Sequence, residues 1–171
     1  MSLNHVGGAA LIVAGLALSP AGSSFAQEVE RHPIPGSDFP IARAVEVPEG
    51  MTTVYLSGAV PSPVSEGEEA GADAQSYGDT TAQTVSVLES IDGTLQDLDL
   101  SMGDVIKMTV FLVAPDGEGM DFEGFMEGYS QFFGTADQPN LPVRSVVQVA
   151  GLANPDWLVE IEVTAVRPPA Q

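Results

Sequence analysis

The chain has 171 residues, no cysteine, and 24 acidic residues against five basic ones, which gives a formal net charge of −19. This length suits one domain with its own hydrophobic core. The lack of cysteine excludes disulfides, thiolate metal sites and cysteine nucleophiles. Because the negative charge repels a phosphate backbone, we expect no nucleic-acid partner.

The N-terminal segment has the composition of an export signal. Residues 1–26 contain no Asp, Glu, Lys or Arg, and the apolar run Ala9–Leu18 lies in their middle. Ser24 and Ala26 supply the small-x-small pattern of a signal-peptidase site. The run is shorter than the roughly 20 residues that span a bilayer. We therefore predict a signal peptide over 1–26, cleavage near Ala26, a periplasmic or secreted protein, and no stable membrane insertion after cleavage.

The rest of the chain is predicted to form one domain, 41–168, after an extended leader, 27–40, that is rich in Pro and Gly. The β-rich runs Ala42–Val47 and Thr52–Ser57 flank a Pro-x-Gly turn, which predicts a β-hairpin. The following acidic stretch, 62–77, is typical of a solvated loop, because no regular spacing organises its carboxylates into a metal site.

Two amphipathic helices are expected. Asp79 can cap the first, which would end near Leu98, and its apolar residues recur every three or four positions. They are Ala82, Val85, Leu88, Ile91, Leu95 and Leu98. Asp121 can cap the second, whose stripe we interpret as core rather than as a stacking platform. It comprises Phe122, Phe125, Met126, Tyr129, Phe132 and Phe133, of which Tyr129 and Phe133 are expected to be scaffold.

Three further strands complete the pattern: Val105–Val113, Val143–Val149 and Trp157–Val166. In the first, alternation places Val105 on the same face as Lys107 and opposite an apolar face. The element order ββ-α-β-α-ββ predicts an α+β two-layer sandwich with both helices on one face of a single sheet. Because the other face would be exposed in a monomer, we expect oligomerisation.

The last two strands carry the most specific motifs. Pro142-Val143-Arg144-Ser145 is followed by Leu158-Val159-Glu160-Ile161-Glu162, and Tyr55-Leu56-Ser57-Gly58 precedes both. These strings, in this order, resemble the Rid family (reactive intermediate deaminases, RidA/YjgF-like) over roughly Pro40–Pro168. The resemblance implies a chorismate-mutase-like fold, a homotrimer and ligand clefts between subunits.

Arg144 is the main candidate for binding a ligand. It lies in an otherwise apolar strand, where it shares a face with Val146 and Gln148. Taken alone, such a residue is more often part of a structural ion pair with a surface acid. A guanidinium can also grip a carboxylate through two hydrogen bonds. The resemblance favours the second interpretation, since the corresponding arginine of the family binds the substrate carboxylate.

The resemblance also assigns Glu160 to the cleft, as the residue that positions a water molecule for attack on a C=N carbon. Glu160 and Glu162 would otherwise be interpreted as a solvated face. Ser57 and Gly58 are further candidates for binding substrate, together with Ile41 and Val146. Ile41 stands where deaminating members usually have tyrosine, and Val146 where they have cysteine. Met126 replaces an expected asparagine, so the cleft is predicted to be more apolar.

We therefore hypothesise an enzyme that hydrolyses small imino acids, of the 2-iminopropanoate type, or enamines to 2-keto acids and ammonia. Arg144 would clamp the carboxylate and Glu160 would position the water, with no cofactor and no metal. Two alternatives stay open. One is a protein of the same fold that binds a small carboxylate without turnover, and the other is a chaperone-like interaction protein.

Overall fold

The computed structural model describes residues 28–64, 76–115 and 119–169. The predicted signal peptide and most of the predicted acidic loop lie outside these residues, so both stay predictions. Within the described part of the chain, no helix combines the length and the apolar character needed to cross a membrane.

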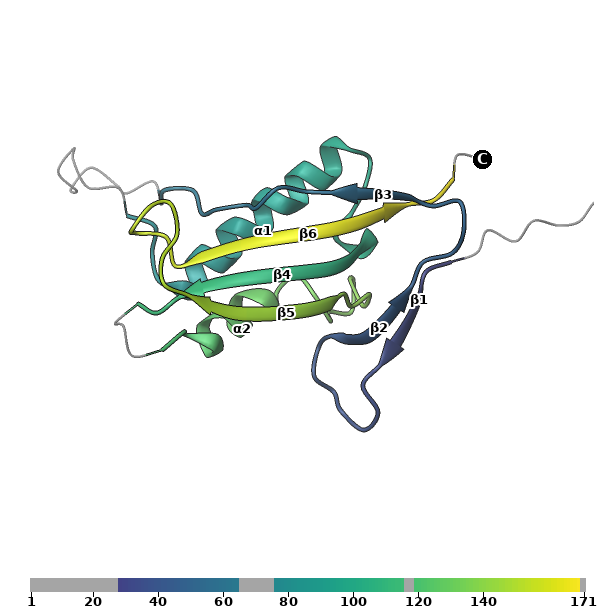
Figure 1. Cartoon of the computed structure of the whole chain (residues 1–171), viewed down its shortest axis with the longest axis horizontal. Coiled ribbons are helices and arrows are strands. Elements are labelled where there is room, and N and C mark those ends of the chain that lie inside the picture. The colour runs from purple at the N-terminus through teal and green to yellow at the C-terminus, as the bar shows by residue number, and fades with distance from the viewer. Residues whose placement is uncertain (1–27, 65–75, 116–118, 170–171) are drawn as a thin grey trace, which may run out of the picture.

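A four-stranded sheet forms one layer of the domain, in the order β3-β6-β4-β5 (Figure 1). Its strands are β3 (Thr52–Tyr55), β4 (Val105–Val113), β5 (Val143–Val149) and β6 (Val159–Arg167). β6 runs antiparallel to β3 and β4, whereas β4 and β5 are parallel. β5 is therefore an edge strand whose crossover connection from β4 contains a helix.

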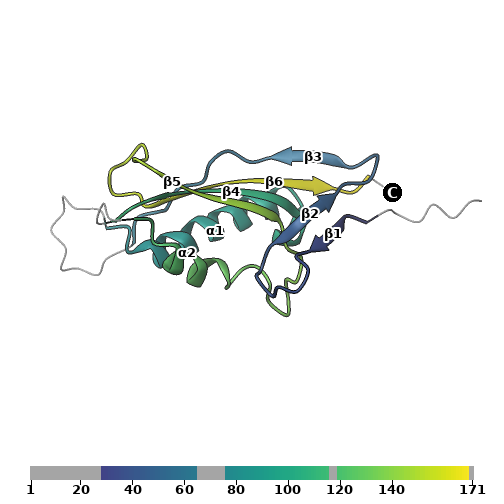
Figure 2. The ribbon, with the colours of Figure 1, turned by 60° about the horizontal axis from the view of Figure 1, so that its bottom comes forward.

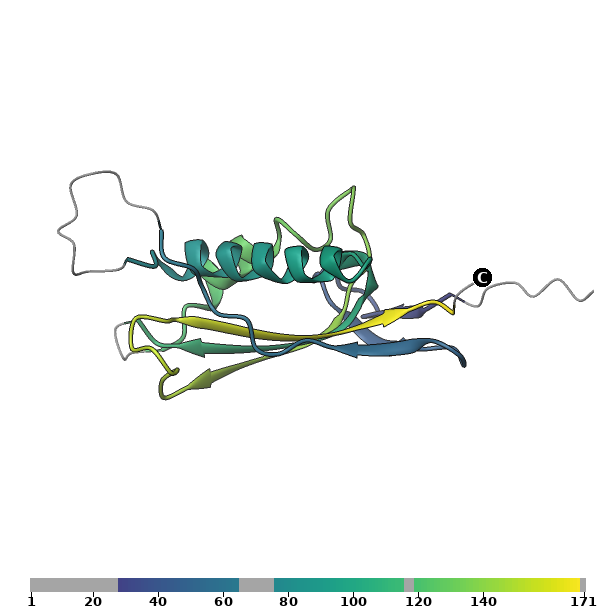
Figure 3. The ribbon, with the colours of Figure 1, turned by 90° about the horizontal axis from the view of Figure 1, so that it is seen from above.

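Both helices cover the same face of this sheet, as Figure 3 shows. α1 spans Thr80–Asp97 and α2 spans Phe122–Tyr129. The predicted caps are present, since the carboxylates of Asp79 and Asp121 accept hydrogen bonds from backbone N–H groups three residues later. The predicted α+β two-layer sandwich is confirmed.

The buried face of α1 differs from the predicted stripe. Leu88 and Leu95 are fully buried as predicted, but Ala82 and Leu98 are exposed. Three polar side chains take part of the buried face: Thr80, Gln83 and Thr84. Gln83 and Thr84 make hydrogen bonds to backbone groups there, which offsets the cost of burying them. α1 and α2 also approach closely, because a Cβ added to Gly128 would overlap the side chain of Thr84.

The alternation predicted for β4 is correct except at its start. Met108, Val110 and Leu112 are fully buried under the helices, and Lys107 is exposed. Val105, predicted to share the face of Lys107, is also fully buried, because the register shifts between these two residues.

The predicted hairpin of Ala42–Val47 with Thr52–Ser57 is wrong. β2 (Ala42–Glu46) pairs instead with β1 (Glu30–Pro33), inside the predicted leader, to form a separate two-stranded sheet (Figure 2). β3 pairs with β6, where Val54 and Leu56 pack against the core. Burial of these apolar side chains therefore outweighs the local turn signal, and β3 joins the main sheet.

Candidate functional site

The side chain of Arg144 extends from the edge strand β5 toward α2. Its Nη2 donates a hydrogen bond to Sδ of Met126 over 3.2 Å. Its Cζ lies 4.1 Å from the ring centroid of Tyr129, 5.0 Å from that of Phe125 and 5.5 Å from that of Phe39. The guanidinium is thus surrounded by aromatic faces, which attract a cation electrostatically.

The same guanidinium has an unused donor. Nη1 of Arg144 is buried and has no hydrogen-bond partner among the described residues. The ion pairs found among those residues join His32 to Glu30 and to Glu46, and none involves Arg144. In the described part of the chain, the interpretation of Arg144 as a structural ion pair is therefore not supported. A buried donor without a partner is unfavourable, so a ligand oxygen that reached this nitrogen would satisfy it.

Tyr129 is both scaffold and part of this site, so the prediction that it is scaffold alone is incomplete. Its ring is fully buried and stacks on Phe133, and its hydroxyl donates to the carbonyl of Pro40 over 2.8 Å. Burial raises the pKa of Tyr129 to about 12 and lowers the pKa of Arg144, while the attraction between the two groups opposes both shifts. At neutral pH a neutral phenol therefore lies beside a charged guanidinium.

The three positions at which the chain departs from the family pattern have different surroundings. Met126 contacts Arg144 directly and fills the place of a more polar acceptor. Val146 points to the same side of β5 as Arg144 and is half-buried against the core. Ile41 follows Pro40, half-buried in a hollow of about 260 Å³ that Leu141 also lines. Met126 and Val146 therefore make the surroundings of Arg144 more apolar, whereas Ile41 lines a separate hollow together with Arg31.

Glu160 lies on the other face of the sheet. It pairs with Phe111 of β4, which pairs in turn with Val147 of β5. Arg144 pairs with the fully buried Met108 and so shares the helix-covered face. Within one chain, Arg144 and Glu160 are therefore separated by the sheet.

Gly58 is adjacent to the carboxylate of Glu160. A Cβ added at Gly58 would overlap Oε1 of Glu160, so only glycine leaves room for this side chain as it lies. The neighbouring Ala59 forms a β-bridge with Ile161, which fixes this segment against β6. Ser57 is exposed beside it. Two groups of candidate residues result, one around Arg144 and one around Glu160.

Comparison with known proteins supports the resemblance suggested by the motifs. Residues 38–167 match the sequence model of the family described as Endoribonuclease L-PSP. The chain belongs to this family, the Rid or YjgF family. The match includes all six predicted site residues, from Ile41 to Glu160, but excludes the whole of β1.

Relatives cover nearly the whole domain of this Rid protein. It is 36% identical over 139 residues to an Escherichia coli protein provisionally named reactive intermediate deaminase TdcF, covering 81% of this chain and 95% of that protein. A RutC family protein from Haemophilus influenzae is 30% identical over 141 residues, covering 82% and 97%.

Solved structures show the same fold. The crystal structure of E. coli TdcF with bound serine is 33% identical, with a TM-score of 0.53, and the match covers 82% of this chain and 98% of that chain. The structure of YyfB, a Rid family protein from Yersinia pestis, has a TM-score of 0.61 at 23% identity, covering 81% and 98%.

Proposed function

We propose that this Rid protein hydrolyses small 2-imino acids, or the enamines that tautomerise to them, to 2-keto acids and ammonia. The observation that carries the proposal is the buried Nη1 of Arg144, which has no hydrogen-bond partner in the described part of a chain with 24 acidic residues. A carboxylate would accept hydrogen bonds from this guanidinium at short range. The relative TdcF, solved with bound serine, holds a ligand that contains such a carboxylate.

The reaction needs an anchor, a placed water and proton transfer. Water adds through its oxygen to the imine carbon, the nitrogen takes up protons, and the C–N bond then breaks to release ammonia. Arg144 would hold the substrate carboxylate, and the carboxylate of Glu160 would accept a hydrogen bond from the attacking water and orient it. The apolar surroundings of Arg144 would favour substrates with small apolar side chains.

Two chains are needed to complete this site. Arg144 and Glu160 lie on opposite faces of one sheet, so a single ligand cannot contact both within one chain. Arg144 is on the edge strand β5, and Glu160 is on the face that α1 and α2 leave open. A homotrimer in which the open face of one chain covers the β5 edge of the next would bring the two groups together.

The description of the family as endoribonucleases suggests RNA as another substrate. The net charge of −19 disfavours this, because RNA binding depends on cationic groups that neutralise phosphates. The described part of the chain offers five cationic residues, and each lies on a different strand: Arg31, Arg43, Lys107, Arg144 and Arg167.

The proposal can be tested by trapping short-lived imines. An amino-acid oxidase generates them from several parent amino acids, and semicarbazide captures those that survive. The wild-type protein should decrease the trapped product and release keto acid, and Arg144→Ala should abolish this effect. Arg43→Ala is the matched control, because Arg43 is exposed on β2 and lies outside both groups of candidate residues.

The alternatives predict different results. If pyruvate or another small carboxylate stabilises the protein against heat in an Arg144-dependent way without any keto-acid release, the protein binds ligand without turnover. If neither effect occurs and the protein suppresses aggregation of a client equally well in wild type and Arg144→Ala, the chaperone-like alternative replaces the enzyme.

A further inference from the structure

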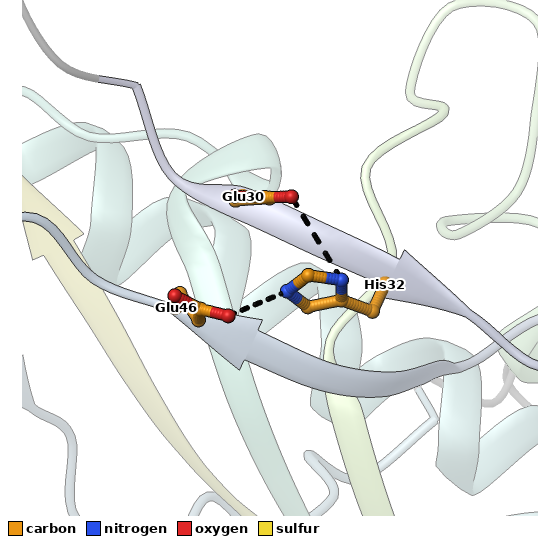
Figure 4. A network of polar contacts seen from close by, with 3 residues as sticks. All are labelled: Glu30, His32 and Glu46. Atoms are coloured by element: carbon orange, nitrogen blue, oxygen red, sulfur yellow. Dashed lines mark hydrogen bonds and ion pairs between the residues drawn. The ribbon is translucent and has the colours of Figure 1, made fainter.

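Three potential metal ligands lie together on the β1–β2 sheet, away from Arg144 and Glu160 (Figure 4). Glu30 pairs directly with Glu46 across the two strands, and His32 lies two residues after Glu30 on the same face of β1. They are the one such group of three found among the described residues. The expectation of no metal did not anticipate this cluster, because β1 was not predicted to pair with β2.

The side chains already point toward one another. Nε2 of His32 lies 2.9 Å from Oε1 of Glu46, and Nδ1 lies 3.8 Å from Oε1 of Glu30. One ligand atom from each residue lies within 4.8 Å of the other two. Zinc binds imidazole nitrogen at about 2.0–2.1 Å and carboxylate oxygen at about 2.0–2.2 Å. His32 faces Glu46 through Nε2 and Glu30 through Nδ1, and one ion can take only one of these nitrogens. The exposed glutamate on the other side of the ring would therefore have to rotate to reach the ion.

The charges in this cluster are unbalanced without a cation. Like charges directly opposite each other on neighbouring strands destabilise the pair. Glu30 and Glu46 occupy such opposite positions in a chain of net charge −19. A divalent ion between the two carboxylates would turn this repulsion into attraction.

We propose that Glu30, His32 and Glu46 bind a divalent transition-metal ion of the zinc class. One imidazole and two carboxylates form a donor set suited to this class, and water would complete the coordination. The cluster is separate from the proposed deaminase site and supplies nothing to that reaction, so its failure would leave the proposed function intact.

Metal binding would link the N-terminal strand β1 more firmly to the rest of the domain. Arg31 projects from the opposite face of β1, and its Nη2 donates to the carbonyls of Gly103 and Val105 over 2.9 and 3.1 Å. The ion would join β1 to β2 on the other face. β1 would then be held from both sides, and opening of this strand would become rarer.

The test uses the untagged full chain, stripped with a chelator and titrated with Zn²⁺ in competition with a chromophoric indicator. We expect one tight equivalent per chain. His32→Gln should weaken it roughly 100-fold, because the change removes a direct ligand, whereas loss of an outer-shell group already weakens binding about 10–100-fold. The chain has one other histidine, and His5→Gln is the matched control that should bind as wild type does.

Two further comparisons separate a built site from general attraction to acidic groups. Glu46→Gln should weaken zinc binding, whereas Glu49→Gln, an exposed glutamate just beyond β2, should not. Zinc should also slow hydrogen exchange at the amides of β1 in wild type but not in His32→Gln. Zinc binding that is equally strong in wild type, His32→Gln and Glu46→Gln would overturn the proposal, as would the absence of a tight equivalent.

Discussion

Gln83 on α1 offers a direct test of how the fold supports the candidate site. This side chain is 1% exposed, and its amide makes three hydrogen bonds to backbone groups. Nε2 donates to the carbonyls of Gly78 and Asp156 over 3.1 and 3.0 Å, and Oε1 accepts from the N–H of Leu158 over 2.7 Å. Gln83 thus ties the start of α1 to the segment that leads into β6.

Gln83→Leu keeps the side-chain volume similar but removes all three hydrogen bonds. Each has a net contribution of about 0.5–1.5 kcal/mol, and backbone groups left buried without a partner increase the loss. Apolar burial of the leucine offsets part of it. We expect the free energy of unfolding to fall by about 2–3 kcal/mol. Imine turnover should also fall, because Leu158 directly precedes the strand that carries Glu160.

Urea unfolding followed by far-UV circular dichroism would measure this loss, at matched chain concentration because the stability of an oligomer depends on that concentration. Gln96→Leu is the control on the same helix, where the amide is exposed and donates to Asp92 over 2.7 Å. Its effect should stay within about 0.5 kcal/mol. If Gln83→Leu is also within that range, the buried amide does not hold α1 to β6.

Three further outcomes are expected. Gly58→Ala should displace the Glu160 carboxylate. It should lower imine turnover at least tenfold with little change in melting temperature. Retained turnover would show that the position of Glu160 is unimportant for the reaction. The pKa of Tyr129 is about 12 in the folded protein and about 10 in the unfolded chain, so the unfolded chain loses this proton first as the pH rises. The free energy of unfolding should therefore fall by roughly 2–3 kcal/mol between about pH 10 and 12. Tyr129→Phe should lack this part of the alkaline loss in urea unfolding, and identical curves would exclude it. If the chain forms the proposed trimer through its open face, Val147→Asp, at a side chain that is 42% exposed there, should lower the mass measured by light scattering. An unchanged mass would place the interface elsewhere.

Elements with a local chemical signal were predictable from the sequence. The capping carboxylates of Asp79 and Asp121 mark where α1 and α2 begin, and the alternating strand Val105–Val113 has the bounds of β4 as observed. The pairing of β2 was not predictable in this way. Strand partners depend on contacts between distant residues, and the Pro-x-Gly turn at Gly50 allows β2 and β3 to diverge as easily as to pair.

The candidate site likewise has features that could be predicted from local sequence and features that could not. Arg144, Gly58 and Glu160 could be selected from motifs, because their neighbours in sequence are characteristic of the family. The contact of Arg144 with Met126 and its stacking on Tyr129 depend on how α2 lies over β5, which periodicity alone does not fix. The separation of Arg144 from Glu160 by the sheet likewise follows only from the observed register.

The aromatic rings around Arg144 explain how it has no ion-pair partner among the described residues of so acidic a chain. The rings of Phe39, Phe125 and Tyr129 occupy the space around the guanidinium where a carboxylate side chain could otherwise approach. A free anionic ligand is repelled at long range by the net charge of −19 but attracted strongly once it reaches the half-buried Arg144. Salt screens the first effect much more than the second. If Arg144 binds a small carboxylate as proposed, the affinity should therefore rise with ionic strength, and a falling affinity would contradict this account.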